Sequence, residues 1–226
     1  MCARYTLAEP GPILDRWPSA GKHGRPQWPP RFNVAPTQDV PALRGDRELV
    51  TLRWGLVPAW ASDPTGAQKR INARVETVAQ TPLYRSAFER RRCAILADGF
   101  YEWSGARGHR QPHRITIDDG APFAFAGLWE RWRRGDQSLE TCTIVTCPAN
   151  ERIAPLHDRM PAIIADDDAL DAWLHGEAAD ALAVAAPFDS ARLRVVAVGP
   201  AVNRATFEDP SCIEPATPSP ALRLFD

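Results

Sequence analysis

The chain has 226 residues, a formal net charge of −1, and a composition of 44% hydrophobic and 24% charged residues, which is typical of a globular protein. It has no run of about 18 apolar residues and no basic start followed by an apolar stretch, so we expect neither a membrane span nor a secretory signal. The five scattered cysteines argue against a disulfide framework and favour a reducing, cytoplasmic setting.

The first half of the chain is predicted to contain few regular elements. Prolines crowd residues 9–30, so we expect a loop there, with one short helical turn at 13–17. Residues 49–57 are rich in β-branched and aromatic residues and predict a strand that Pro58 ends. Residues 82–91 predict a helix with Thr81 as its cap and Pro82 in its first turn.

The second half of the chain is predicted to be richer in strands. We expect 93–97 and 99–103 to be paired strand segments, with further strands at 114–117, 123–128, 141–147 and 193–198. Residues 166–175 predict a helix with acidic residues at its positive end, and 176–186 predict a second one. Since strands and helices do not alternate regularly, the fold class is α+β, and residues 1–226 are expected to form one domain.

Cys2 is a candidate nucleophile. Aminopeptidases remove Met1 when a small residue follows, and Cys2 would then carry a free thiol and a free α-amine on adjacent carbons. The reference pKa values of these groups are about 8.5 and about 7.7–8.0, so both are usable nucleophiles near neutrality. Together they condense with an aldehyde to a five-membered thiazolidine ring. Its position alone favours the alternative that Cys2 is a small buried hydrophobic residue or an incidental one.

Three short motifs add candidate polar groups. Asn72 could orient a reacting group and Arg74 could bind a phosphate, or the segment could be a turn capped by its Asn. Glu102 lies among aromatic residues, and burial would raise its pKa into the range useful for proton transfer; the alternative is a carboxylate on a solvent-facing edge strand. His157 lies between Pro155 and Pro161 in a rigid loop and could transfer protons, or could belong to a capped turn.

No metal site or cofactor is predicted. Cys142 and Cys147 are five residues apart on a predicted strand, which places them on opposite faces. His109 and His113 have Gly108 and Pro112 beside them, which is incompatible with a helical zinc motif.

Taken together, the motifs resemble the SRAP family (SOS response-associated peptidases, or abasic-site processing proteins). The resemblance runs along nearly the whole chain, and its segments occur in the family's order. They are MCAR at 1–4, RFNVAPTQ at 31–38, RWGLVPAW at 53–60, INARVET at 71–77, RCAILADGFYEW at 92–103, TIVTCPAN at 143–150 and PLHDRMPAI at 155–163.

The resemblance implies a single α+β domain with a curved, barrel-like mixed sheet flanked by helices. It implies binding to single-stranded DNA and to single-strand/double-strand junctions, and covalent capture of abasic sites during the DNA damage response. We expect a monomer that needs no cofactor and associates with the bacterial nucleoid when bound to DNA. AP-lyase-like and peptidase activities, including autocatalytic removal of Met1, are also implied.

Carried over motif by motif, the resemblance assigns a role to ten residues. The catalytic residues would be Cys2 as nucleophile, Asn72 to position the amine and aldehyde, Glu102 to transfer protons, and His157 to assist ring closure and release. The DNA-binding residues would be Arg4, Arg74 and Arg159 on phosphates, and Asn33, Pro36 and Trp60 on bases.

One departure from the family pattern lies beside the nucleophile. Ala3 stands where the family usually has glycine, which would cost about 1 kcal/mol if the backbone there needs a positive φ. Two other functions remain as alternatives: a class II glutamine amidotransferase-like hydrolase, which also uses an N-terminal Cys, and a non-covalent reader of modified DNA.

Overall fold

Five strands close into a barrel. The computed structural model describes residues 2–17, 28–45, 47–106 and 110–217. The barrel strands are β3 (Asp39–Arg44), β4 (Glu48–Trp54), β6 (Arg92–Ala97), β9 (Phe123–Arg134) and β10 (Gln137–Pro148). β10 pairs with β9 antiparallel and with β4 in parallel, which completes the ring. Three short strands extend it: β5 (Asn72–Arg74) and β11 (Arg159–Pro161) pair with β10, and β12 (Ile163–Ile164) pairs with β9.

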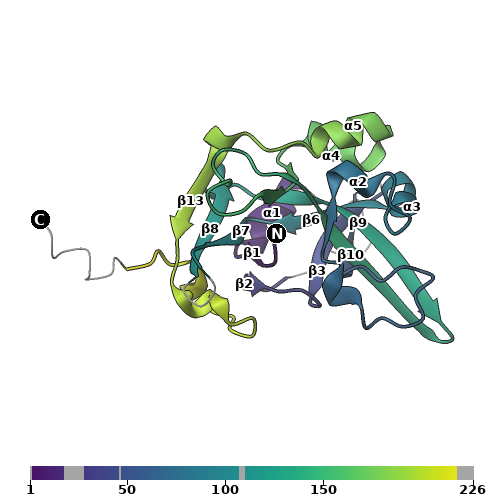
Figure 1. Cartoon of the computed structure of the whole chain (residues 1–226), viewed down its shortest axis with the longest axis horizontal. Helices are drawn as coiled ribbons and strands as arrows, with labels where there is room; N and C mark the ends of the chain where they lie inside the picture. The colour runs from purple at the N-terminus through teal and green to yellow at the C-terminus, as the bar shows by residue number, and fades with distance from the viewer. Residues whose placement is uncertain (1, 18–27, 46, 107–109, 218–226) are drawn as a thin grey trace, which may run out of the picture.

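A second, antiparallel sheet stands beside the barrel. Its order is β13 (Leu193–Ala197), β8 (Gln111–Ile117), β7 (Gly99–Ser104), β1 (Tyr5–Leu7) and β2 (Arg31–Val34). In Figure 1 this sheet occupies the left of the molecule and the barrel the right, with β1 between them. Side chains of both layers share one core: the Tyr5 ring of β1 packs edge-on against Trp54 and Phe125 of the barrel, at centroid distances of 5.4 and 5.5 Å.

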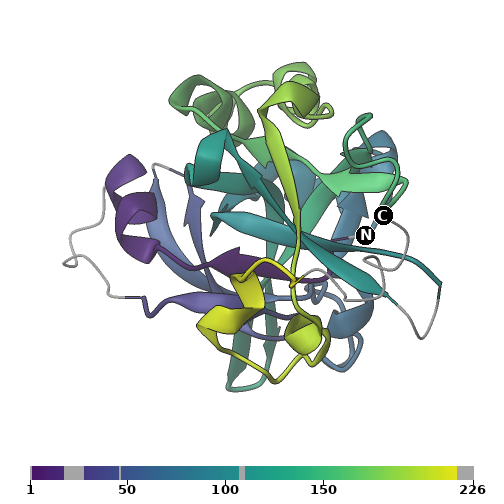
Figure 2. The same ribbon diagram turned by 90° about the vertical axis from the view of Figure 1, so that its left-hand side faces the viewer.

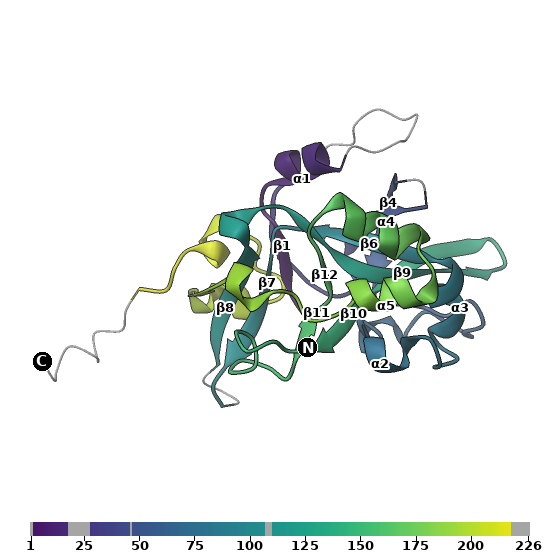
Figure 3. The ribbon, with the colours of Figure 1, turned by 90° about the horizontal axis from the view of Figure 1, so that it is seen from above.

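The helices lie outside the sheets. They are α1 (Pro10–Arg16), α2 (Val75–Val78), α3 (Arg85–Arg90), α4 (Asp167–His175) and α5 (Ala178–Val184), of which α4 and α5 cover the barrel side by side (Figure 3). The Asp166 carboxylate caps α4 by accepting a hydrogen bond from the Ala169 N–H, and Trp173 on its inner face donates to the Cys93 carbonyl. In the described part of the chain, no helix has the length and apolar character needed to cross a membrane.

The α+β fold class and the barrel-like mixed sheet are confirmed. The predicted pairing of 93–97 with 99–103 is wrong, because β6 pairs with β3 and β9 whereas β7 pairs with β1 and β8. Asp98 alone separates the two strands, and a hairpin needs at least two connecting residues. The chain instead crosses from the barrel to the second sheet at this point. The buried Asp98 carboxylate stabilises this connection by accepting hydrogen bonds from Thr6 Oγ1 (2.5 Å) and the Glu9 N–H (2.8 Å).

Several predicted boundaries shift. The helix predicted at 82–91 begins at Arg85, with Tyr84 rather than Thr81 as its cap residue. The strand predicted at 49–57 ends at Trp54, because Gly55 has a φ of +125° and no room for a Cβ, which would lie 2.7 Å from the Ala67 carbonyl oxygen. The proline-rich stretch 9–30 begins with α1, and residues 18–27 lie outside the described part.

Candidate functional site

Cys2 is fully buried where the two sheets meet, directly before β1. Its Sγ lies 3.7 Å from the Arg4 carbonyl oxygen, to which the thiol donates. Burial raises the pKa of the thiol well above its usual range, and the negative charge of Glu102 adds to the effect. The thiol is therefore protonated at neutral pH and needs a base before it can react.

Asn72 holds the main chain of Cys2. It lies at the start of β5, which β10 fixes through the pairing of Ile144 with Asn72. Its Nδ2 donates to the Cys2 carbonyl oxygen at 2.9 Å, and its own carbonyl oxygen accepts from the Tyr84 hydroxyl at 3.2 Å. The Asn72 Oδ1 is buried and has no donor among the described residues, which leaves an acceptor for a group that arrives with a ligand.

Glu102 is a buried carboxylic acid on β7, with 3% of the residue exposed. Burial raises its pKa from 4.5 to about 7, and the nearby Asp158 carboxylate acts in the same direction. The alternative of a solvent-facing edge strand does not hold, because β7 is paired on both sides, by β1 and by β8. A carboxyl group with this pKa donates and accepts protons at neutral pH.

His157 is half-buried and lies in the loop that precedes β11. Its backbone N–H donates to the Ile153 carbonyl, and its Nδ1 accepts from the Arg159 N–H at 2.9 Å. The Asp158 carboxylate also lies 2.8 Å from Nδ1, but a nitrogen that accepts from Arg159 has no proton to donate. Burial lowers the pKa of His157, so the neutral ring with its proton on Nε2 is the state at neutral pH.

These groups belong to one electrostatic neighbourhood. The charge of Glu102 acts on the Cys2 thiol, and Asp158 and Arg110 act on both Glu102 and His157. Asn72 and Glu102 thus lie beside Cys2, and His157 shares the charged neighbours Asp158 and Arg110 with Glu102. Ala3 is not among the residues with positive φ, so its methyl group strains no backbone there.

Of the predicted DNA-binding residues, three lie at the surface. Trp60 is 71% exposed, Arg74 is exposed and Pro36 is half-buried. Arg159, by contrast, is 7% exposed and its guanidinium is bound to both oxygens of Glu76 and to the Thr146 carbonyl.

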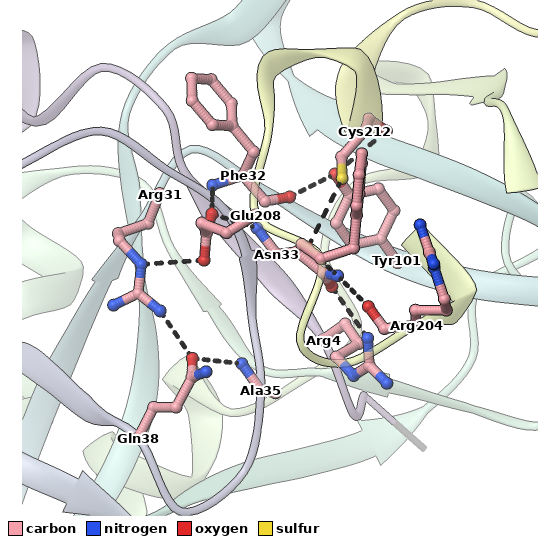
Figure 4. A network of polar contacts seen from close by, with 11 residues as sticks. Arg4, Arg31, Phe32, Asn33, Ala35, Gln38, Tyr101, Arg204, Glu208 and Cys212 are labelled. Atoms are coloured by element: carbon pink, nitrogen blue, oxygen red, sulfur yellow. Dashed lines mark hydrogen bonds and ion pairs between the residues drawn. The ribbon is translucent and has the colours of Figure 1, made fainter. Parts of the chain in front are cut away.

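Arg4 and Asn33 are also engaged within the protein. The Arg4 Nη1 donates to the Asn33 Oδ1 at 2.9 Å and to the Val202 carbonyl at 3.0 Å. Asn33 is fully buried, and its Nδ2 donates to the carbonyls of Arg204 and Phe207 (Figure 4). The DNA roles of these two residues stay predictions. No group of side chains suited to a metal ion occurs among the described residues.

Comparison with known proteins identifies the family. The sequence model of the SOS response associated peptidase (SRAP) family matches residues 1–205. The chain belongs to the SRAP family.

Among the curated SRAP relatives, the abasic site processing protein YoaM of Bacillus subtilis (strain 168) is 40% identical over 181 residues, 77% of this chain and 79% of its own length. The abasic site processing protein YoqW of the same organism is 35% identical over 223 residues, 95% and 99% of the two chains. A crystal structure of a protein from Bordetella bronchiseptica superposes with a TM-score of 0.75 at 29% identity, covering 88% of this chain and 100% of that one.

Two residues that contact the candidate site residues were not predicted from the sequence. The Tyr84 hydroxyl donates to the Asn72 carbonyl, and the Glu76 carboxylate accepts hydrogen bonds from the Arg159 guanidinium. Glu76 lies inside the INARVET segment, four residues after Asn72, and this motif is recognisable in the sequence. Its ion pair with Arg159 is not, because Arg159 lies 83 positions further along the chain. Tyr84 lies in a predicted helix, and nothing in the sequence around it indicated a contact with Asn72.

Proposed function

We propose that this protein senses abasic sites in single-stranded DNA and at single-strand/double-strand junctions, and captures them covalently through Cys2 once Met1 has been removed. The adduct shields the lesion during the DNA damage response, and the protein acts as a monomer on DNA in the bacterial nucleoid. The observation that carries the proposal is the hydrogen bond from Asn72 to the Cys2 carbonyl beside Glu102, a buried acid with a pKa of about 7.

The reaction begins at the amine, because the buried thiol is protonated. The ring-opened form of an abasic site is an aldehyde. The α-amine of Cys2 adds to its carbonyl carbon, and loss of water gives a Schiff base. The Schiff base nitrogen keeps its proton; the thiol gives its own proton to Glu102 and adds to the same carbon, which closes a neutral thiazolidine. One water is released and nothing is oxidised or reduced.

Each neighbouring group has one part in this sequence. Glu102, with a pKa of about 7, gives a proton to the departing water and takes one from the thiol. Asn72 fixes the Cys2 main chain, and its unpaired Oδ1 accepts a hydrogen bond from the amine or the carbinolamine hydroxyl. His157, neutral with its proton on Nε2, assists ring closure and, in reverse, release.

Surface residues would hold the DNA. The exposed Trp60 stacks on a base, Pro36 wedges beside it, and Arg74 binds a phosphate. Arg159 can bind a phosphate only if its guanidinium first releases the Glu76 carboxylate. AP-lyase-like strand cleavage would start from the same Schiff base, and autocatalytic peptidase action on the Met1–Cys2 bond would use the same thiol.

A denaturing gel tests the proposal. Purified protein is incubated with single-stranded DNA that contains one abasic site, and a slower band is expected that is absent with Cys2→Ser and with undamaged DNA. Intact mass reports whether Met1 has been removed. No shifted band with the Met1-free wild type refutes covalent capture. Binding without a band, unchanged in Cys2→Ser, would identify a non-covalent reader, and release of ammonia from glutamine would identify an amidotransferase-like hydrolase.

A further inference from the structure

The segment 200–213, here called the C-terminal strap, runs across the outer face of the second sheet (Figure 2). It contains two short 3-10 turns, η4 (Pro200–Asn203) and η5 (Pro210–Ile213). Val202 and Cys212 are buried against Tyr101 in an apolar cluster separate from the main core. The strap is therefore a packed layer with its own small core.

Polar contacts also join β2 and the strap, and most of them run from a side chain of one segment to the main chain of the other. The Asn33 Nδ2 donates to the Arg204 carbonyl at 2.9 Å and to the Phe207 carbonyl at 2.8 Å. In return, the Glu208 carboxylate accepts from the backbone N–H groups of Phe32 and Asn33 and from the Arg31 Nε at 3.0 Å (Figure 4). The buried Asn33 amide is thus satisfied by the strap, and Glu208 of the strap in turn binds the main chain of β2, so the position of the strap on β2 is specific.

One set of contacts leads from the strap to Cys2. The Arg4 guanidinium bridges the Asn33 Oδ1 and the Val202 carbonyl, so the strap and β2 together hold this side chain. The carbonyl of Arg4 accepts from the Cys2 thiol, and the Tyr101 N–H donates to the same carbonyl at 3.0 Å. The residue that positions the thiol is therefore tied to the strap through its side chain.

A second set of contacts leads from the strap to Glu102. Because side chains alternate along a strand, Tyr101 and Trp103 lie on the face of β7 opposite to that of Glu102. The Tyr101 hydroxyl donates to the Phe32 carbonyl at 2.7 Å, and the Trp103 Nε1 donates to the Asn203 Oδ1 at 2.7 Å. Both residues that flank Glu102 are thus held by the strap or its partner strand.

We propose that the strap is a positioning device that sets the Cys2 main chain and Glu102 relative to each other, and that Glu208 is the positioning residue that locks it. Phe207, Glu208 and Cys212 lie beyond residue 205, where the family match ends. The role of the strap in covalent capture rests on the function proposed above. Asn33 and Arg4 then serve the reaction from inside the protein, as links between the strap and the nucleophile.

The test compares Glu208→Ala with Glu140→Ala. Both carboxylates are half-buried, 33% and 23% exposed, and both bind arginines, but Glu140 lies in the β9–β10 hairpin on the far side of the molecule (Figure 1). Crosslinking is timed at saturating abasic-site DNA, and DNA affinity is measured separately by anisotropy with Cys2→Ser in each background. We expect Glu208→Ala to crosslink about tenfold more slowly with little change in affinity, since misplacement of reacting groups acts on the rate.

Glu208→Gln keeps an oxygen for the Phe32 and Asn33 N–H groups and is expected to restore most of the rate, whereas Glu140→Ala leaves the rate unchanged. A wild-type rate in Glu208→Ala, or an equal loss in Glu140→Ala, overturns the proposal. If Glu208→Ala does not fold, Glu208→Ser is compared with Glu140→Ser, and a slower rate in the former alone is the expected result.

Hydrogen exchange separates this proposal from the proposed function. Amides of residues 2–7 and 99–104 are expected to exchange faster in Glu208→Ala than in the wild type or in Glu140→Ala, because loss of the lock loosens β1 and β7. This readout needs no DNA. If the wild type forms no adduct, the proposed function fails, and the exchange of these two segments still decides whether the strap holds them. Unchanged exchange refutes the strap proposal.

Discussion

Replacing Glu102 with Gln is expected to stabilise the protein at alkaline pH and to slow crosslinking. The carboxyl is 3% exposed, and its pKa rises from 4.5 to about 7 on folding. Between these two values the folded state keeps the proton that the unfolded state has released, so stability falls as pH rises and levels off above the folded pKa. At about 1.4 kcal/mol per tenfold change, the loss amounts to about 3 kcal/mol.

The neutral Gln side chain has the same shape and avoids this loss. Urea denaturation of both proteins at about pH 4.5, 6 and 8 should therefore give equal stabilities at the lowest pH and a variant more stable by about 3 kcal/mol at the highest. In parallel, the crosslinking rate of the wild type should bend near pH 7, and that bend should be absent in the variant. A stability difference that does not change with pH would refute a buried, titrating Glu102.

Three further outcomes are expected. Asn72→Ala leaves the Cys2 carbonyl without its donor and should slow crosslinking roughly tenfold, for a lost hydrogen bond of about 1–2 kcal/mol, in the gel assay; a wild-type rate contradicts this. Asp98→Ala removes the partner of Thr6 and Arg114 and should lower the free energy of unfolding by about 3–5 kcal/mol in urea; a loss below about 1 kcal/mol contradicts it. Trp60→Ala should leave stability within about 0.5 kcal/mol yet weaken DNA binding by about 1–3 kcal/mol, measured by anisotropy; unchanged affinity excludes stacking.

The candidate catalytic residues were recognised in short motifs whose chemistry is visible locally. The structure places Asn72 and Glu102 beside Cys2, and the catalytic roles of Cys2, Asn72, Glu102 and His157 stay predictions. Arg4 and Asn33 were expected to contact DNA because the family resemblance assigns that role to their motifs. Their partners, Val202 and Phe207, lie about 170 to 200 positions along the chain, and no local pattern announces such contacts.

Contacts between residues far apart in sequence also explain the errors in the predicted fold. The strands at 93–97 and 99–103 were recognised from their composition, but pairing depends on which distant strands compete for each edge. β6 takes β3 and β9 as its neighbours, and β7 takes β1 and β8. The chain passes from one sheet to the other at Asp98, but this becomes evident only from the contacts of Asp98 with Thr6 and Glu9. Helix α4 was predicted almost completely, because its cap, its acidic first turn and its buried face are all local.

The burial of Cys2 has a consequence for how the protein survives oxidising conditions. Peroxides attack the thiolate, and susceptibility follows thiolate character and exposure. Here the side chain is fully buried and its pKa is raised, so both access to the sulfur and formation of the thiolate are disfavoured. The burial that keeps the Cys2 thiol protonated thus also protects its sulfur from oxidation, which would preserve the proposed nucleophile until an aldehyde reaches it.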